Sequence, residues 1–260
     1  MSELTRSPIE DAPQIAARLK AMTPARVGLG RTGVSQRTRD LLDFQRSHAQ
    51  ARDAVQAKLE SASLAAEIVE VVRGLQSMQV IRLQSAASDR ATYLQRPDLG
   101  RKLSDVSRET LAKLTRDPFD LVLIVADGLS ALAIERHVPL LLKELLPLLA
   151  DWRLAPIAIV EQGRVAIGDE IGALLGAAVS VVLIGERPGL SSPDSLGAYI
   201  TWNPRPGRTD AERNCISNIR IEGLSYTQAA HQLRDCLLTA RQRQLTGVAL
   251  KESTNLLKEG

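Results

Sequence analysis

The feature that most constrains the fold is a change of hydrophobic period near residue 119. From there the chain holds four short apolar runs rich in Val and Ile: "FDLVLIVADG", "APIAIVEQGRVAIG", "VSVVLIGERPG" and "LGAYITWNP". Helical stretches at about 129–149 and 169–177 separate the first three. Continuous apolar strands that alternate with helices are typical of a parallel sheet covered on both faces. The pattern therefore predicts an α/β fold with a Rossmann-like, mostly parallel sheet.

Before residue 119 the period is helical. Within 37–59 the apolar residues recur at spacings of three, four and seven: Leu41, Phe44, Ala51, Val55 and Leu59. A second apolar stripe runs from Leu64 to Leu75, and a further helix is expected over 105–115. After the sheet, a last amphipathic helix is expected over 226–244. The chain thus combines a helical N-terminal region with a C-terminal α/β part.

Three regions follow from these patterns. We expect a leader with a glycine-rich loop over 1–36, a helical assembly region over 37–118, and a Rossmann-like domain over 119–260. In the leader, "PQIAARLKAM" carries apolar residues on one helical face: Ile15, Leu19 and Met22. This segment is interpreted either as a frayed terminal helix or as a packaging signal.

Composition excludes several classes of function. Lys and Arg total 33 against 30 Asp and Glu, and the formal charge of +3 is too small to indicate nucleic-acid binding. Aromatic residues make up only 3%, which is too few for base-stacking surfaces. No apolar run approaches the roughly 20 residues that a membrane span needs. Cys215 and Cys236 have no spacing suited to zinc, and a reducing, cytoplasmic setting is expected.

Four strand ends carry polar or glycine residues, and ligands of such sheets bind where strands end. They are Asp127-Gly128, Glu161-Gln162-Gly163, Gly185-Glu186-Arg187-Pro188 and Asn203-Pro204. Each taken alone is a turn signal, because turns need these residue types. Together, at one edge of a sheet, they indicate a ligand site.

Conventional chemical machinery is absent from the sequence. "GLGRTG" at 28–33 satisfies a dinucleotide-binding pattern, but no strand precedes it, so we expect a tightly packed glycine-rich loop instead. The chain has no phosphate loop, no nucleophile elbow, and no His or Cys at metal spacing. The pair Asp169-Glu170 begins a helix, where acids favour the helix dipole. We therefore predict no catalytic residue and no metal ligand, and a subunit that holds part of a cofactor.

Several long motifs in succession carry a family resemblance. In order they include "RVGLGRTG", "LVLIVADGLSALAIERH", "LIGERPGLSSPDSLGAYITWNP" and "RNCISNIRIEGLSYTQAA". From about residue 25 onward, the chain closely resembles the small (light) subunits of ethanolamine ammonia-lyase. The resemblance implies a hetero-oligomer with a catalytic large subunit, which converts ethanolamine to acetaldehyde and ammonia with adenosylcobalamin.

The resemblance also implies where the cofactor is contacted. In this family, contacts of the small subunit with cobalamin fall in the "GRVA", "GERPG" and "RNC" motifs, which gives Val165, Glu186 and Cys215 here. Glu186 is expected to accept a hydrogen bond, and Cys215 to pack as a small apolar residue after the last strand. No histidine stands in a D-x-H-x-x-G pattern, so cobalamin is expected to keep its benzimidazole as lower ligand.

An alternative from another class remains open, namely a stand-alone α/β enzyme or binding module for a nucleotide-like metabolite. A cytoplasmic location is expected. In some bacteria the family's enzyme is packaged in a protein-shelled microcompartment, so the leader leaves that location open as well.

Overall fold

The computed structural model describes residues 12–23, 27, 29, 31–73, 78–114 and 118–250. Its strands are β1 (Arg31–Thr32), β2 (Ser35–Gln36), β3 (Val80–Gln84), β4 (Phe119–Ala126), β5 (Ile157–Glu161), β6 (Ala177–Gly185), β7 (Leu196–Trp202) and β8 (Arg213–Ile219). Its α-helices are α1 (Ala12–Met22), α2 (Thr38–Gln56), α3 (Ser61–Val72), α4 (Arg90–Gln95), α5 (Asp105–Ala112), α6 (Ala131–Leu145), α7 (Ile167–Leu175) and α8 (Tyr226–Arg243). Three 3₁₀ turns join them: Leu99–Arg101, Leu146–Leu149 and Asp210–Glu212.

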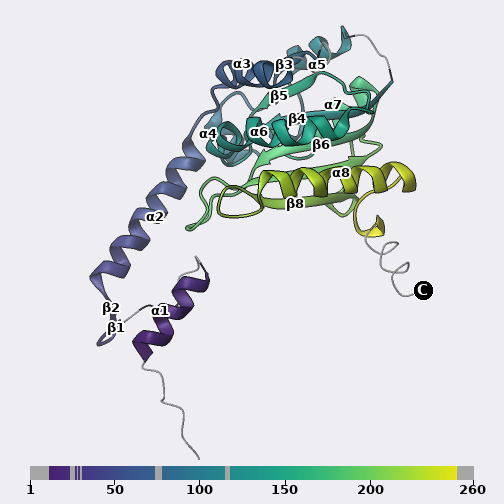
Figure 1. Cartoon of the computed structure of the whole chain (residues 1–260). Helices are drawn as coiled ribbons and strands as arrows, with labels where there is room; N and C mark the ends of the chain where they lie inside the picture. The colour runs from purple at the N-terminus through teal and green to yellow at the C-terminus, as the bar shows by residue number, and fades with distance from the viewer. Residues whose placement is uncertain are drawn as a thin grey trace, which may run out of the picture.

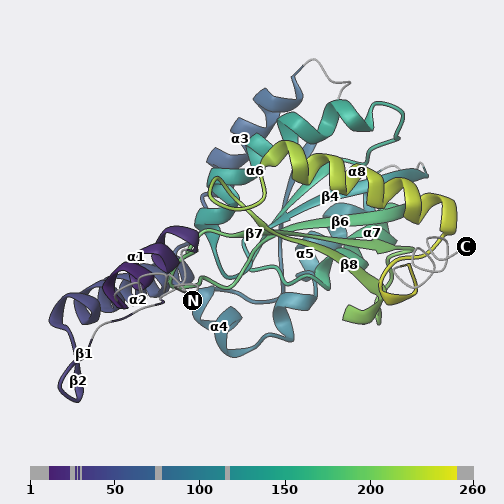
Figure 2. The same cartoon turned by 60° about the horizontal axis from the view of Figure 1, so that its bottom comes forward.

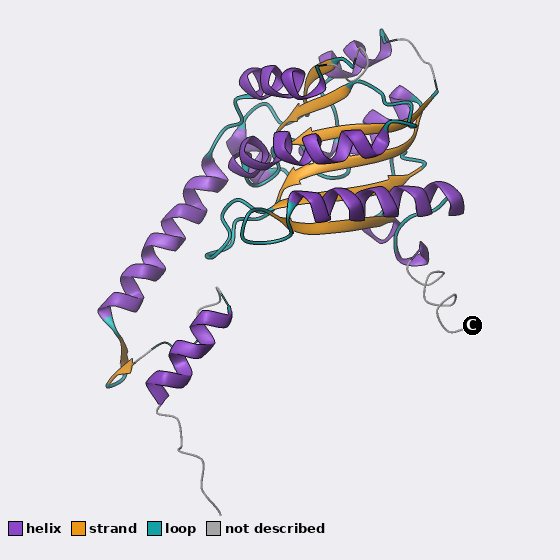
Figure 3. Cartoon of the chain, viewed as in Figure 1, coloured by secondary structure: helices purple, strands orange, loops and turns teal. Residues whose placement is uncertain are grey.

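The central feature of the described chain is a six-stranded mixed sheet (Figures 1 and 3). Its order is β3-β5-β4-β6-β7-β8. Strands β3, β5, β4 and β6 run parallel, whereas β7 is antiparallel to both β6 and β8. The predicted α/β class with a mostly parallel sheet is confirmed.

Helices cover both faces of the sheet. The buried residues of β4 are all apolar, and they point alternately to one face and to the other. Leu121, Leu123 and Val125 face a core shared with α3, α6 and α8. The alternate residues Val122 and Ile124 face a second core, which includes residues of α5 and α7. Figure 2 shows α3, α6 and α8 along one face of the sheet and α5 and α7 on the other.

Two strands of the six-stranded sheet lie where the sequence analysis expected none, as does the short pair β1 and β2. Strand β3 falls inside the region 37–118, whose helical prediction is wrong for residues 80–84. Its sequence "VIRLQ" is short and half polar, because β3 is an edge strand with one neighbour. Strand β8, "RNCISNI", is the opposite edge and is polar for the same reason. The three-region division of the chain stays a prediction.

The segment before α3 extends away from the sheet (Figures 1 and 3). The leader forms helix α1, as predicted, and the three apolar residues of its predicted face are exposed: Ile15, Leu19 and Met22. Between β1 and β2, Gly33 adopts a φ of 61° and has no atom within 4 Å of its Cβ position. The predicted tight packing of the glycine-rich loop is therefore not seen at Gly33, while Gly28 and Gly30 lie outside the described residues.

Helix α7 lies unusually close to the sheet because two glycines face it. A Cβ on Gly168 would lie 2.4 Å from Val182 Cγ2, and one on Gly172 would lie 2.4 Å from Pro204 Cγ. Side chains at these positions would push α7 away from β6 and from the segment after β7. The glycines thus set the distance between α7 and the sheet.

We predict that Gly172→Ala lowers the free energy of unfolding by about 1–3 kcal/mol, measured by urea titration of the full chain. The clash with Pro204 costs more than the roughly 1 kcal/mol that alanine gains over glycine inside a helix. The control is Gly189→Ala, whose new Cβ would meet only the movable Ser192 Oγ at 3.0 Å. It should change stability by less than about 0.5 kcal/mol. A Gly172→Ala chain as stable as wild type would contradict this account of α7.

Candidate functional site

One side of β7 and β8 is left open by the helices. Helix α7 packs on β4 and β6, whereas α8 packs on β7 and β8 from the opposite side of the sheet. In β7, Leu196, Ala198 and Ile200 point into the core beneath α8. The alternate residues Gly197 and Tyr199 therefore point to the side of α7, where no described helix covers them. We call this surface, formed by Val165, Glu186, Tyr199 and Cys215, the Tyr199 face.

Glu186 follows β6 directly, at the carboxyl edge where the sequence analysis expected it. Its Oε2 accepts hydrogen bonds from the Ser195 hydroxyl and, at 3.3 Å, from the Asn218 backbone N–H. The carboxylate lies over Gly197, since a Cβ at that position would be 2.9 Å from Glu186 Oε1. Glycine in β7 therefore makes room for the carboxylate on the same side of the sheet as Tyr199.

Cys215 lies in the middle of β8, so its predicted place after the last strand is wrong. Its side chain is exposed, because β8 is an edge strand with no described helix over this side of the sheet. Its expected packing as a small apolar residue against the cofactor stays a prediction. In the ladder Cys215 stands opposite Tyr199, so both side chains project from the same face.

Tyr199 is the site residue that the sequence analysis missed. Burial raises the pKa of its phenol, and the neighbouring Cys215 thiol and Glu186 carboxylate raise that pKa further. The hydroxyl is therefore held neutral, as a hydrogen-bond donor or acceptor. The alternation of Gly197, Tyr199 and Thr201 with apolar residues in "LGAYITW" is the signal that could have placed Tyr199 on an open face.

Val165 lies in the turn between β5 and α7 and adjoins the same surface. It lines a hollow of about 470 Å³ together with Tyr199, Arg164 and Arg208. The three residues singled out from the sequence thus come from three separate segments and gather around Tyr199.

The four polar strand ends do not share one edge of the sheet. Because β4, β5 and β6 are parallel, Asp127, Gln162 and Glu186 do follow strands at a common carboxyl edge. Strand β7 runs the other way, with Trp202 paired to Val179 near the start of β6. Asn203 therefore lies at the opposite edge, and its predicted place in the site is wrong.

The corner at Asp127-Gly128 is filled by the chain itself. Strands β4 and β5 are neighbours, yet the helices that follow them, α6 and α7, cover opposite faces, which is the arrangement that opens a ligand crevice. Here Arg90 enters the crevice and donates hydrogen bonds to the Gly128 carbonyl at 2.8 Å and the Val55 carbonyl at 2.7 Å. Tyr93 is fully buried beside it and donates to the Gly163 carbonyl at 3.2 Å.

Asp127 balances the charge of Arg90 inside the crevice. Its Oδ2 lies 3.5 Å from Arg90 Nη1, and its Oδ1 accepts a hydrogen bond from the Gly163 N–H at 3.0 Å. Burial raises the pKa of the Asp127 carboxyl to about 6, although the charge of Arg90 opposes that rise. The corner thus holds a buried internal ion pair between Arg90 and Asp127.

We predict a distinct pH dependence of stability for Asp127→Asn. Because the folded-state pKa of about 6 exceeds the ordinary 3.8, the folded chain binds more protons between these values, and wild-type stability falls as pH rises through this window. From pH 4 to pH 7 the difference in unfolding free energy should move by about 2 kcal/mol in favour of the asparagine variant. Urea titrations of the full chain at both pH values measure it.

The control for that experiment is Asp98→Asn. A hydrogen bond from Arg96 lowers the pKa of the exposed Asp98 carboxyl, so its difference from wild type should move in the opposite direction. If the free energies of unfolding of wild type and Asp127→Asn changed equally with pH, the raised pKa of the Asp127 carboxyl would be contradicted.

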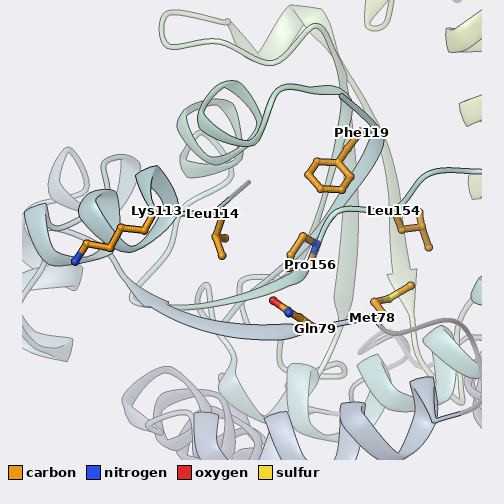
Figure 4. Close-up of a pocket in the computed structure, with 7 residues that line it drawn as sticks. All are labelled: Met78, Gln79, Lys113, Leu114, Phe119, Leu154 and Pro156. Carbon is orange, nitrogen blue, oxygen red and sulfur yellow. The ribbon is translucent and has the colours of Figure 1, made fainter. Parts of the chain in front are cut away.

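A second hollow of about 310 Å³ lies at the other edge of the sheet (Figure 4). Met78, Phe119 and Pro156 line it at or just before the starts of β3, β4 and β5, and Lys113 is directed away from them. Few polar groups converge there, so its described walls do not form a comparable site. In the described ranges no cluster of His, Cys, Asp and Glu could hold a metal ion. Nor is any helix in those ranges long and apolar enough to cross a membrane.

Fold and site together define an α/β protein that offers an open sheet face, instead of a closed pocket, to whatever it binds. The family model of the ethanolamine ammonia-lyase light chain (EutC) matches residues 13–251. The chain belongs to this family.

Curated relatives agree with that family. An ethanolamine ammonia-lyase small subunit of Pseudomonas fluorescens is 57% identical over 243 residues, which cover 92% of this chain and 87% of the relative. One from Xanthomonas campestris pv. campestris is 55% identical over 244 residues, covering 92% and 88%. One from Pseudomonas putida is 54% identical over 256 residues, covering 96% and 92%.

Proposed function

We propose that this chain is the cofactor-contacting small subunit of an adenosylcobalamin-dependent ethanolamine ammonia-lyase, which converts ethanolamine to acetaldehyde and ammonia. The observation that carries the proposal is the gathering of Val165, Glu186 and Cys215 around Tyr199 on one open face. Adenosylcobalamin supplies the radical that begins the reaction, and the residues of this chain hold the cofactor without taking part in that step.

The chemistry of the Tyr199 face fits cobalamin, which is large, flat in its corrin ring and edged with amide side chains. Val165 offers an apolar contact. Both hydrogen bonds that Glu186 accepts go to Oε2, which leaves Oε1 to accept one from a corrin amide. Arg164 adds a cation beside Val165, since its side chain lines the same hollow.

The lower ligand of the cobalt comes from the cofactor itself in this proposal. His137 and His231 belong to α6 and α8 on the far side of the sheet, and His137 is hydrogen-bonded to the Tyr226 hydroxyl at 2.9 Å. His48 belongs to α2 and stacks on Phe44. Since no histidine lies on the Tyr199 face, cobalamin would bind there with its own benzimidazole in place.

A large subunit supplies what this chain lacks. The Tyr199 face is open and cannot enclose a radical reaction, so a partner that carries the substrate site and the catalytic groups would close over the cofactor. The exposed apolar residues of the N-terminal segment give that partner a second surface, formed by Ile15, Leu19, Met22, Leu41, Leu42 and Phe44. The hetero-oligomer would act in the cytoplasm. The apolar face of α1 also suits a packaging leader for a protein-shelled microcompartment.

The Glu186→Ala variant tests the cofactor contact. In the complex reconstituted with a large subunit, we predict a ten-fold to hundred-fold weaker affinity for adenosylcobalamin, because a charge-assisted hydrogen bond is worth about 1.5–3 kcal/mol. Turnover at saturating cofactor should change much less, since the carboxylate takes no part in hydrogen abstraction. Equilibrium titration followed by the cobalamin absorption spectrum measures the affinity.

Glu161→Ala is the matched control. Like Glu186, Glu161 ends a parallel strand and accepts a hydrogen bond from a serine hydroxyl, that of Ser61. Because Ser61 begins α3, this contact belongs to the other side of the sheet, and the variant should keep wild-type affinity. Equal affinities of Glu186→Ala and wild type would remove Glu186 from the site.

Deletion of residues 1–36 tests the assembly role of the N-terminal segment. We predict that the truncated chain binds the large subunit at least ten-fold more weakly, because the exposed apolar residues of α1 are lost. Analytical ultracentrifugation of the two subunits measures the association. If the truncated chain associated with the large subunit as strongly as the full chain does, this role would be refuted.

A further inference from the structure

A third hollow lies next to the one beside Val165. It measures about 350 Å³ and shares Arg101, Ala166 and Arg208 with the first. Together the two form a groove along the start of α7, which we call the α7 groove. Its walls bring five cations together from distant segments of the chain: Arg101, Lys102, Arg108, Arg164 and Arg208.

The acids that line the α7 groove are fewer than its cations, so part of its positive charge is not compensated. Glu170 accepts a hydrogen bond from Arg108 at 2.7 Å. Asp169 is held by the buried Arg213, to which Asp210 also lies close, at 3.5 Å. Two of the three acids that line the groove are therefore already paired, and the third, Asp210, is 93% exposed.

Three of the cations keep their charge available. In the part of the chain that the structure describes, neither Arg101 nor Lys102 nor Arg164 has a carboxylate within salt-bridge distance. The guanidinium of Arg164 rests on the Tyr93 ring, 4.2 Å from its centroid, and its buried Nε has no hydrogen-bond partner in the described ranges. Stacking on a neutral ring leaves the charge of Arg164 uncompensated beside the groove.

Backbone donors add to these cations. The N–H groups of Val165 and Ala166, just before α7, donate to no acceptor in the described chain. The start of a helix also carries partial positive charge, which favours an anion. Guanidinium groups beside such donors match the oxygens of a phosphate ester.

We propose that the α7 groove binds a phosphodiester, and that this group is the one in the nucleotide tail of cobalamin. The inference rests on the proposed function, because Val165 belongs both to the Tyr199 face and to the groove. The phosphodiester is the anionic group that links the benzimidazole nucleotide to the corrin. Arg101 and Arg164 neutralise it, while Glu186 and Cys215 contact the rest of the cofactor.

The test compares adenosylcobalamin with adenosylcobinamide, which lacks the phosphodiester and the benzimidazole nucleotide. Both ligands are titrated into the reconstituted complex of this chain with a large subunit, for wild type, Arg101→Gln and Arg164→Gln. We expect each variant to bind adenosylcobalamin about ten-fold more weakly, the size of one charge-assisted contact, with unchanged affinity for adenosylcobinamide. Arg101→Gln is the cleaner variant, because no stacking contact or ion pair of the Arg101 side chain is seen in the described chain.

Arg243→Gln is the matched control. It removes the same charge from an exposed side chain of α8, on the other side of the sheet and outside the α7 groove, so it should leave both affinities as in wild type. Inorganic phosphate should weaken the binding of adenosylcobalamin to wild type and leave that of adenosylcobinamide unaltered. Equal losses for both ligands, or no loss for either, would overturn the phosphodiester site alone. A wild-type complex that binds neither ligand would overturn the proposed function with it.

Discussion

The ion pair between Asp169 and Arg213 joins the two halves of the sheet. Asp169 begins α7, which covers the parallel strands, and Arg213 begins β8, the last antiparallel strand. Two hydrogen bonds of 2.7 Å connect the side chains, and each is at most 3% exposed. Burying two charges has a large desolvation cost, so the pair adds little net stability, but removing either partner would cost about 3–5 kcal/mol. Its effect is to fix where β8 lies relative to α7.

The open Tyr199 face depends on that arrangement. Helix α7 has only nine residues and sits close to β6 through Gly168 and Gly172, so it does not reach across β7. With Arg213 anchored to the start of α7, the antiparallel strands extend the sheet beyond the helix. Tyr199 and Cys215 are then left uncovered on one side while α8 buries the other. Arg213 also donates a hydrogen bond to the Arg208 carbonyl at 3.1 Å, which ties one cation of the α7 groove to the same anchor.

Much of this could be predicted from the sequence, because the inner strands are strongly apolar. The runs over β4, β5 and β6 and the helices between them follow from hydrophobic period alone. The edge strands β3 and β8 could not be predicted, since a strand with one neighbour is half polar and resembles a loop. The misplacements of Asn203 and Cys215 have different causes. Apolar content does not tell a parallel strand from an antiparallel one, and the direction of β7 puts Asn203 at the other edge. Cys215 was expected after the last strand because β8 itself was not predicted.

Within the site, the sequence was most informative where a motif matched and least where contacts are long-range. Glu186 lies at the predicted edge because "LIGERPG" ends a buried run at a turn. Arg90 was not singled out, because nothing local links it to Asp127, 37 positions away in the printed sequence. The cationic groove is also invisible to composition, since its members are spread from Arg101 to Arg208 in a chain of net charge +3.

The filled crevice explains why binding should occur elsewhere on this sheet. A stand-alone α/β enzyme or nucleotide-binding module would use the crevice between β4 and β5, where the connections diverge. In this chain Arg90 and Tyr93 occupy that crevice, and opening it would expose a buried ion pair and break the hydrogen bond to Gly128. Such an opening costs several kcal/mol before any ligand contact is made. In the proposed function, binding takes place on the antiparallel side instead, where an open face suits a large cofactor shared with a second protein better than a small nucleotide enclosed by one chain.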